Sequence, residues 1–285
     1  MRPACGSTSA WASWRRDACA GTSTARMESS TSRCWRSSPR TGDACAGHFW
    51  RSSSMSDARR VAIHQPAYLP WLGYFDRIAR VDRFVFLDTV QFEKNSFINR
   101  NRIKTPQGAQ WLTVPVLGRG HLASTLRETR IDESRDWRRD HLKAVAMNYR
   151  RAPRFAERYA QLEQLYAERQ DNLAELCWRQ LGFWLDELGI ETPLVRASEL
   201  DVDSRKSQLV LDICLALGAD SYLSGALGRD YLDEAAFAER GIDVHYQAFT
   251  PPTYPQLWGA FVPGLGVLDW WMNSGDSRSE FRELT

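Results

Sequence analysis

Closely spaced pairs of cysteines are missing from this sequence, and so are long apolar runs. Four of the six cysteines lie within residues 1–54, where none has the near neighbour that a zinc site requires. The other two, Cys177 and Cys214, lie in apolar helical patterns, so we expect buried, reduced thiols and a cytoplasmic protein. No apolar stretch is long enough for a signal-peptide core or a membrane-spanning helix. The sequence therefore predicts no secretion signal and no transmembrane segment.

Lysine is absent from residues 1–54, which contain eight arginines, three acidic residues and four of the twelve tryptophans. Neither a helical nor a strand period is found in this segment. Arginine without lysine, together with much Cys, Trp, Ser and Ala, is typical of a GC-rich frame translated upstream of a true start. We therefore interpret residues 1–54 as lying outside the native coding sequence, with Met55 as the natural start. A disordered basic tail is the alternative interpretation.

An excess of charge of one sign is also missing. The chain has 37 Lys and Arg against 35 Asp and Glu, a net charge of +2. Without residues 1–54 these counts fall by eight and three, to 29 and 32, and the net charge becomes −3. Such a balance lacks the basic excess of a general nucleic-acid binder, so we expect no nucleic-acid partner. The remaining length is enough for one substantial core, with room for a helical insertion.

The clearest fold signal lies in residues 61–104. A β-branched apolar run starts at Val61 and should end at His64, because Pro66 removes a ladder donor and restrains the residue before it. Apolar residues at spacings of four, three and four then predict a helix over residues 70–80. Residues 83–87 form a second compact apolar run, typical of a strand that is buried on both sides in a parallel sheet. This order predicts an α/β fold with a mostly parallel, open, Rossmann-like sheet.

Polar side chains follow both of these strands. His64 and Gln65 follow the first strand, and Asp88 and Gln91 follow the second. Ligands of open α/β sheets bind outside the carboxyl ends of the strands, so we predict that these side chains face a ligand. The stretch that comes next is dense in hydrogen-bond donors and is predicted to hold an anion. Its candidates are Lys94, Asn99, Arg100 and Asn101.

Residues 136–188 are predicted to be a block of three helices inserted into the α/β domain. Apolar side chains recur on one face of each helix, and we expect most of the aromatic side chains in the core. His141 and Lys143 lie on the first helix. Two interpretations remain open for this pair, an anion-binding site and a solvated helix face.

Residues 221–232, with the sequence SYLSGALGRDYL, form a second stretch with chemical signals. A short strand leads into a loop of small residues and then, we expect, into a helix that begins near Asp230. The backbone at Ser224 and Gly225, the helix N-terminus and the Arg229 guanidinium would together hold a phosphate. A tight turn with Asp230 as the N-cap is the alternative. The candidates here are Ser224, Gly225, Arg229 and Tyr231.

The rest of the chain adds strands, a short helix and a tail. Residues 192–200 and 242–249 are predicted to be strands, and residues 267–272 a helical turn that packs on the core. The last residues, 276–285, are polar and are expected to be mobile. We therefore expect one α/β domain over residues 55–275.

Several blocks of the sequence together resemble the WbqC-like family of bacterial proteins. The likeness runs from about residue 60 to the C-terminus. Members of this family are associated with surface-polysaccharide and O-antigen gene clusters, so the resemblance implies a role in making or decorating a glycan. It adds Tyr68 to the candidate ligand-binding residues. The blocks are HQPAYLPWLGYF (64–75), FVFLDTVQF (84–92), NRN (99–101), DWRRDHL (136–142), LGADSYLSG (217–225) and GRDYLD (228–233).

A partial, architectural resemblance to the nucleotidyltransferase and pantothenate-synthetase group bears on mechanism. That group carries two histidines separated by two residues, whereas here His64 stands alone, which argues against adenylyl or cytidylyl transfer. The resemblance still implies binding of a nucleotide or nucleotide-sugar donor. His64 and Lys94 are the predicted catalytic residues, which would neutralise charge on phosphate oxygens.

Three hypotheses follow. The first is a transferase that moves a sugar, acyl or nucleotidyl group from a phosphate-bearing donor to a glycan precursor. The second is a non-catalytic binding or assembly subunit of a glycan pathway. The third is a metal-dependent glycosyltransferase that uses Asp201 and Asp203. Because acidic residues just before a helix are usually capping residues, we predict that this pair holds no metal.

Overall fold

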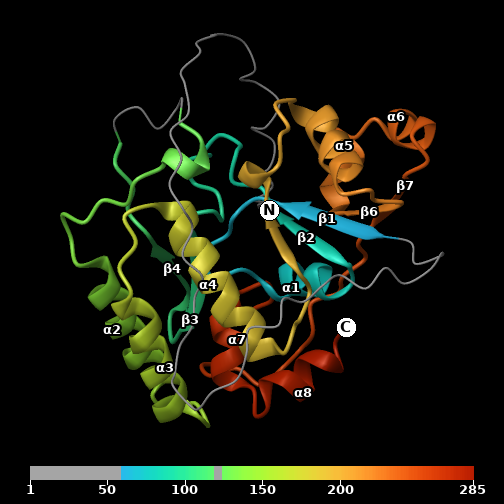
Figure 1. Ribbon diagram of the computed structural model, residues 1–285. Coiled ribbons are helices and arrows are strands. Elements are labelled where there is room, and N and C mark those ends of the chain that lie inside the picture. The colour runs from blue at the N-terminus through green and yellow to red at the C-terminus, as the bar shows by residue number, and fades with distance from the viewer. Residues whose placement is uncertain (1–58, 119–123) are drawn as a thin grey trace, which may run out of the picture. The chain divides into compact units, whose positions relative to one another are not determined.

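Parallel strands form the central sheet, in the order β5-β2-β1-β6-β7 (Figure 1). The computed structural model describes residues 59–118 and 124–285, so the interpretation of residues 1–54 lies outside the described residues. The prediction of an α/β fold with a mostly parallel sheet is confirmed. The strands are β1 (Arg60–His64), β2 (Arg83–Phe86), β5 (Leu194–Arg196), β6 (Ser221–Ser224) and β7 (Asp243–Tyr246).

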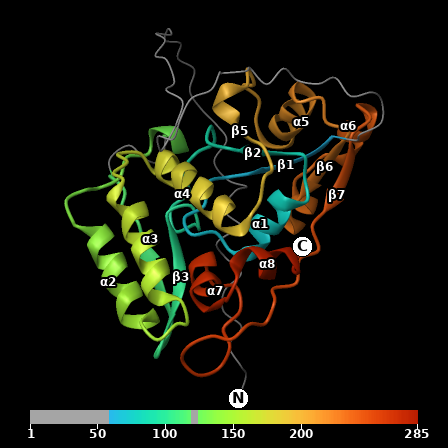
Figure 2. The same cartoon turned by 60° about the horizontal axis from the view of Figure 1, so that its bottom comes forward.

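Helices cover both faces of this sheet. In Figures 1 and 2, α5 and α6 lie on one side of the sheet, and α1, α7 and α8 lie on the other. The strands predicted over residues 192–200 and 242–249 are present but shorter, since only their central residues join the ladders. The helices are α1 (Leu72–Ala79), α2 (Trp137–Tyr149), α3 (Phe155–Ala167), α4 (Leu173–Leu188), α5 (Lys206–Ala216), α6 (Glu234–Glu239), α7 (Val267–Asn273) and α8 (Ser277–Arg282).

The two faces of the sheet belong to two hydrophobic clusters. Successive side chains of a strand point to opposite faces, so the apolar residues of β2 are divided between the clusters. Phe84 and Phe86 pack in the cluster that includes α1, α4 and α7. Val85 and Leu87 pack in the cluster that includes α5 and α6. This double burial explains why β2 has no polar face in the sequence.

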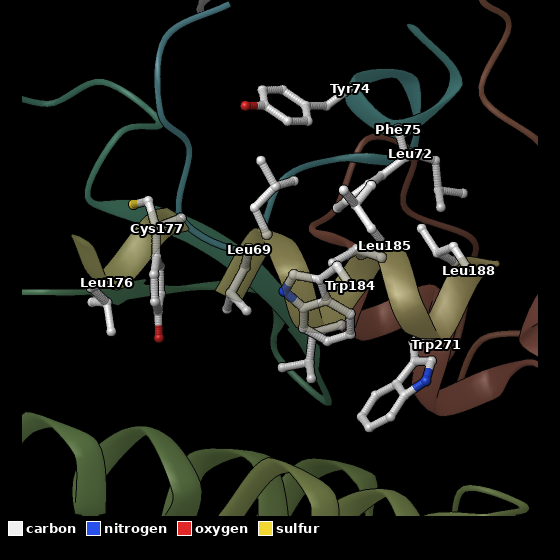
Figure 3. Close-up of a cluster of buried hydrophobic side chains, with 14 of the residues drawn as sticks. Leu69, Leu72, Tyr74, Phe75, Leu176, Cys177, Trp184, Leu185, Leu188 and Trp271 are labelled. Carbon is white, nitrogen blue, oxygen red and sulfur yellow. The ribbon is translucent and has the colours of Figure 1, made fainter. Parts of the chain in front are cut away.

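Helix α4 is the centre of the larger cluster. Figure 3 shows its side chains meeting Leu69 and Leu72 from the β1 to α1 segment and Trp271 from α7. Trp184 and Trp271 are fully buried, and their rings meet edge to face with centroids 5.2 Å apart. Gly189 ends the helix in a left-handed conformation, as an αL cap requires.

A separate two-stranded hairpin follows the first β-α-β unit. Strands β3 (Arg100–Thr105) and β4 (Gly108–Thr113) pair antiparallel through a turn at Pro106 and Gln107. The predicted helical block follows the hairpin as α2, α3 and α4 (Figure 1). The segment that contains Arg100 and Asn101 is therefore a strand of this hairpin and not a loop at the edge of the main sheet.

Residues 276–285, which are expected from the sequence to be mobile, include a short helix. Residues Ser277–Arg282 form α8, with Asp276 as its N-cap. Phe281 is buried and meets Trp270 of α7 edge to face, with ring centroids 6.3 Å apart. One apolar residue among polar ones is enough to dock this short helix, and such a signal is too weak to recognise by periodicity.

Candidate functional site

The direction of the chain across the sheet reverses next to β1. Strand β2 lies on one side of β1 and β6 on the other, which makes the β1 and β6 ends a topological switch point. The ladder between β1 and β2 has four residue pairs and reaches His64↔Phe86. The ladder between β1 and β6 has two pairs and stops at Val61↔Tyr222. The carboxyl ends of β1 and β6 are therefore not joined by ladder hydrogen bonds, and side chains lie between them.

Arg77 of α1 reaches this point and is buried, with 6% of its surface exposed. Its Nε and Nη2 atoms donate to Gln247 Oε1 at 3.0 and 2.9 Å. Gln247 follows β7, and its Nε2 donates in turn to the Gly73 carbonyl at 2.8 Å. A Cβ atom on Gly225 would lie 2.8 Å from Arg77 Nη2, so the guanidinium fits there because residue 225 is a glycine. We call His64, Gln65, Arg77, Ser224 and Gly225 the switch-point site.

His64 at the end of β1 is neutral at physiological pH. Its Nδ1 donates to the Gln65 carbonyl at 2.9 Å, and its ring meets Tyr74 edge to face with centroids 4.9 Å apart. Burial first, and the nearby charge of Arg77 second, lower the pKa of His64 from 6.5 to about 3, although the bond to Gln65 opposes this. Since a carbonyl only accepts, Nδ1 carries the proton and Nε2 is the basic nitrogen. His64 therefore offers hydrogen bonding and not a positive charge.

Ser224 and Gly225 end β6 on the other side of the switch point. Ser224 is buried, and its Oγ packs against Gly228, where a Cβ would be 2.0 Å away. No hydrogen bond of ordinary geometry to Ser224 Oγ is found among the described residues, although the Tyr222 hydroxyl is near enough for this serine to lower the Tyr222 pKa. The backbone of the loop after β6 thus lies close to Arg77, and the buried Ser224 hydroxyl packs against Gly228 in the same loop.

The α-helix predicted to begin near Asp230 does not begin there. Residues Ala226–Asp230 form a 3₁₀-helix, and α6 begins at Glu234. The N-cap of α6 is Asp233, whose carboxylate accepts from Ala236 N at 3.3 Å. The run of small residues shortens the turn into a 3₁₀-helix, so the N-terminus of α6 falls several residues later than predicted.

The other candidates of this stretch lie at its surface. The Arg229 guanidinium stacks on the Tyr246 ring, with Cζ 3.9 Å from the centroid. Tyr231 is 39% exposed; burial of the hydroxyl raises its pKa, while Arg77 and a hydrogen bond with Tyr222 lower it. Leu227, two residues before Arg229, is also exposed. The Arg229 side chain thus contacts Tyr246 of β7, and Tyr231 is the candidate residue of this stretch that interacts with Arg77.

Asp88 and Gln91 lie on the β2 side of the sheet edge. The buried Asp88 carboxylate accepts from Ser198 N at 2.9 Å and from Ser198 Oγ at 2.7 Å. This pair ties the end of β2 to the segment after β5. Gln91 is exposed and forms an isolated antiparallel bridge with Thr125. Asp88 is therefore used inside the protein, where it holds neighbouring strand ends together.

The predicted anion-binding stretch is divided by the hairpin. Lys94 is exposed in the loop after β2. Asn99 Nδ2 donates to the Val114 carbonyl at 2.8 Å, and Asn101 Nδ2 donates to the Leu69 carbonyl at 2.6 Å. The two asparagines thus fasten the hairpin to its surroundings. Arg100 lies on the outward face of β3.

Tyr68 and His141 meet in the core of the helical block. The Tyr68 hydroxyl bonds His141 Nδ1 at 2.9 Å and also the Tyr166 hydroxyl. Burial lowers the pKa of His141 to about 4, and a hydrogen bond with the Thr113 backbone opposes this shift. These residues join the segment after β1 to α2 and α3, and both side chains are buried. His141 is buried and Lys143 is exposed, so the two side chains differ in environment, and the anion-binding role stays a prediction.

A second group of buried polar residues lies beneath the hairpin. Asp269 of α7 is fully buried and accepts from the Tyr149 hydroxyl at 2.6 Å, the Tyr254 hydroxyl at 2.8 Å and Gln256 Nε2 at 2.9 Å. Lys104 Nζ donates to Gln256 Oε1 at 2.9 Å. Desolvation raises the pKa of Asp269, while the two phenols, Lys104 and Gln256 lower it. We call these five residues the Lys104–Asp269 cluster.

Sequence reasoning missed Arg77 and Gln247. Arg77 lies in a helix whose sequence is that of an ordinary amphipathic segment, and Gln247 follows a strand that alternates regularly. Neither has a local signal, because their meeting depends on the order of β1, β6 and β7 in the sheet. The switch-point geometry is what identifies them.

Acidic and metal-ligating residues form no further centre in the described parts. Over residues 59–118 and 124–285, no three His, Cys, Asp or Glu side chains gather as metal ligands. Asp201 and Asp203 are exposed, and the N-cap of α5 is Arg205, so the pair does not cap this helix. No helix within the described ranges has both the length and the apolar character needed to cross a membrane.

Comparison with known proteins gives two matches. Residues 65–280 match the model of the WbqC-like protein family, so that all of the switch-point site except His64 lies within the match. The chain is also 40% identical over 227 residues to the uncharacterized protein Rv1507c of Mycobacterium tuberculosis. That alignment covers 78% of this chain and 97% of the relative. No solved structure matches the chain.

Proposed function

Because the chain belongs to the WbqC-like protein family, we propose that it is a transferase of surface-polysaccharide biosynthesis, of the O-antigen type, with a phosphate-bearing activated donor. The donor is a nucleotide or nucleotide-sugar, and the acceptor is a glycan precursor. The reaction takes place in the cytoplasm, in keeping with the two buried free thiols of Cys177 and Cys214.

One observation carries this proposal, namely the Arg77 guanidinium held at the ends of β6 and β7 by Gly225 and Gln247. It lies at the position where open α/β sheets bind ligands. Its hydrogen-bond acceptor is the neutral amide of Gln247, and it belongs to none of the ion pairs of the described chain. The Asp76 carboxylate reaches Arg77 only through Gln247 and is paired directly with Arg80, so the charge of Arg77 is suited to a phosphate group.

Each residue of the switch-point site has a role in this proposal. Arg77 holds the phosphate next to the transferred group, and the backbone at Ser224 and Gly225 donates to its oxygens. When the donor bond breaks, its electron pair stays on a phosphate oxygen, where Arg77 stabilises the added negative charge. His64 and Gln65 orient the donor by hydrogen bonds. Lys94 and Arg229 are exposed at the edge and contribute longer-range attraction for the anion.

A second candidate function, a non-catalytic binding or assembly subunit, is favoured by one observation. The basic residue of the switch-point site, His64, has a pKa of about 3 and is therefore a weak general base. Under this alternative the donor or its analogue binds at the same place without turnover. The two functions differ in turnover and not in the site.

The test is a thermal-shift screen of the full chain against nucleotides, nucleotide-sugars, sugar phosphates and acyl-CoA, each with and without magnesium. A ligand at 100 times its Kd stabilises the fold by about 2.7 kcal/mol, which is easily detected. We expect Arg77→Met to weaken the best ligand by about 10- to 100-fold, because a charge-assisted bond to phosphate is lost. Gly225→Ala should weaken it too, since the new Cβ displaces the guanidinium.

The control is Arg240→Gln, which removes an exposed arginine at the end of α6 and should leave the shift unchanged. Product formation from the best donor then separates the transferase from the binding subunit. If all nucleotides and sugar phosphates fail to shift the folded protein, or if Arg77→Met binds as well as the parent, the donor site is wrong.

A further inference from the structure

The outward face of the β3–β4 hairpin carries cations and an aromatic ring together. The antiparallel register sets Arg102 opposite Trp111, and directly opposite residues project from the same face. Arg100 is two residues before Arg102 in β3 and so shares that face. On the other face Ile103 and Leu112 are buried. We call Arg100, Arg102 and Trp111 the Trp111 face.

The two guanidinium groups are held against the same ring. Arg100 Cζ lies 4.4 Å and Arg102 Cζ 5.5 Å from the Trp111 ring centroid. Phe97 supports the ring from the side, at 5.7 Å between centroids. Cation–π contact fixes the planes of the guanidinium groups, which lowers the entropy lost when they bind a ligand. With 41% of its surface exposed, Trp111 also leaves part of its ring system open.

In the described part of the chain, the two guanidinium groups donate to backbone carbonyls and not to carboxylates. Neither arginine takes part in any of the ion pairs found over residues 59–118 and 124–285. Each donates from Nη2 to a backbone carbonyl, Arg100 to Asn95 at 2.6 Å and Arg102 to Gly264 at 3.2 Å. Two like charges beside one ring repel each other, and an oxyanion bound between them would remove that repulsion.

We propose that the Trp111 face binds an anionic saccharide. The flat apolar side of a sugar ring lies on the exposed part of Trp111, and a carboxylate or phosphate of the sugar lies between Arg100 and Arg102. The binding of an anion is inferred from the geometry of the two arginines and does not depend on the proposed function. The choice of a saccharide as the ligand rests on the proposed glycan function. This face is distinct from the switch-point site, since its residues come from the hairpin and not from the ends of the main sheet.

The charge distribution favours a saccharide over a nucleic acid. A nucleic-acid footprint needs a long basic stripe in a basic domain, whereas residues 55–285 carry a net charge of −3. Two arginines on alternate strand positions match one or two anionic groups. A single exposed aromatic residue matches one sugar ring.

The experiment is a calorimetric titration of the full chain with a galacturonic acid tetramer and with maltotetraose, a neutral sugar of the same length. We expect the acidic sugar to bind at least about tenfold more tightly, through the two guanidinium groups. Trp111→Ala and Arg102→Gln should each weaken the acidic sugar by about tenfold. Arg139→Gln, at an exposed site on α2, is the matched control and should change nothing. Circular dichroism checks that each variant is folded.

The outcomes separate this proposal from the donor site. Equal binding of the two sugars, no binding of either, or an unchanged affinity of Trp111→Ala would overturn it. Tighter binding of a short oligonucleotide than of the acidic sugar would overturn it in favour of a nucleic-acid surface. The donor-induced thermal shift should be the same in Trp111→Ala as in the parent, so a failed donor screen with intact sugar binding removes only the switch-point proposal.

Discussion

Two buried cations of this protein, Lys104 and Arg77, are each linked to a buried carboxylate through a glutamine, but the two carboxylates differ in their other partners. Lys104 belongs to a cluster in which Gln256 bridges its ammonium group to the Asp269 carboxylate. Arg77 bonds Gln247 through its Nε and Nη2 atoms, and Gln247 donates to the buried Asp76 carboxylate, which is paired directly with Arg80. Both side chains are at least nine-tenths buried. Asp269 has no direct ion pair with another cation in the described residues, so Lys104 balances it within the fold, whereas Asp76 already has Arg80, which leaves the charge of Arg77 suited to a ligand.

The two settings also differ in how far they spread through the chain. The Lys104–Asp269 cluster joins β3, α2 and α7 to the segment around residues 254–256, so it fastens the C-terminal part to the hairpin. The switch-point site joins α1 to the ends of β6 and β7 through Gln247 and Gly225. In the Lys104–Asp269 cluster the polar side chains hydrogen-bond one another. In the switch-point site, Arg77 lies where the ladder hydrogen bonds of the strands end.

The most direct way to break this comparison is the matched pair Lys104→Met and Arg77→Met. Lys104→Met leaves the Asp269 carboxylate buried without a cation and should lower the free energy of unfolding by about 3–5 kcal/mol. Arg77→Met leaves the Gln247 carbonyl oxygen unpaired while Asp76 keeps its direct partner Arg80, and it should cost about 1–3 kcal/mol. Urea unfolding of both variants measures the difference. An equal or larger loss for Arg77→Met would show that Arg77 is as much a part of the fold as Lys104.

Acid should affect the switch-point site through His64. The folded pKa of about 3 is below the unfolded value of 6.5, so the unfolded chain takes up a proton first as the pH falls. The stability from this group is complete above pH 6.5 and is lost by up to about 1.4 kcal/mol per pH unit below it, until the folded pKa is reached. Asp269 acts in the opposite direction, because its raised pKa favours the protonated carboxyl in the folded state.

His64→Gln should therefore flatten the dependence of unfolding free energy on pH, measured by urea unfolding between about pH 4 and pH 7. His141→Gln is a useful comparison, because burial also lowers the pKa of His141, to about 4, in the core of the helical block. It should flatten the same limb without any effect on donor binding. An acid limb that survives unchanged in both variants would contradict the assignment of these histidines.

The smallest expected effect comes from a pair of glycines. A Cβ on Gly228 would lie 2.0 Å from Ser224 Oγ, so Gly228→Ala should cost about 1–3 kcal/mol and disturb the loop after β6. No atom lies within 4 Å of a Cβ on Gly182 in α4, so Gly182→Ala should stabilise the protein by up to about 1 kcal/mol. Thermal melts of the two variants report the difference. A Gly228→Ala variant as stable as the parent would show that this loop adapts easily.

The sequence was sufficient wherever a signal was local. Pro66 marks the end of β1 at His64, and the apolar run of β2 reports burial on both faces. The helical block was recognisable because its apolar stripes repeat over many turns. In each case the residues that determine the element are neighbours in the chain.

The remaining features depend on tertiary contacts. The position of Arg77 depends on Gly225, which lies far away in the sequence. The partners of Asp269 come from α2, from β3 by way of Gln256, and from the segment around residues 254–256. Arg100 and Asn101 looked like one donor-rich stretch, but strand geometry turns one outward and the other inward. The 3₁₀-helix before α6 differs from the predicted α-helix by small changes in local hydrogen bonding, which composition does not report.

The short ladder between β1 and β6 also has a kinetic consequence. Arg59 and Asp220, which are hydrogen-bonded next to this ladder, are 161 positions apart in the chain. Contacts between such distant residues close a long loop and form late, whereas the ladder between β6 and β7 is more local and more extensive. We therefore expect the two halves of the sheet to meet late in folding, and the switch-point site to be completed only when they do. A bound donor would then stabilise the contact between β1 and β6, which would form last in folding and open first in unfolding.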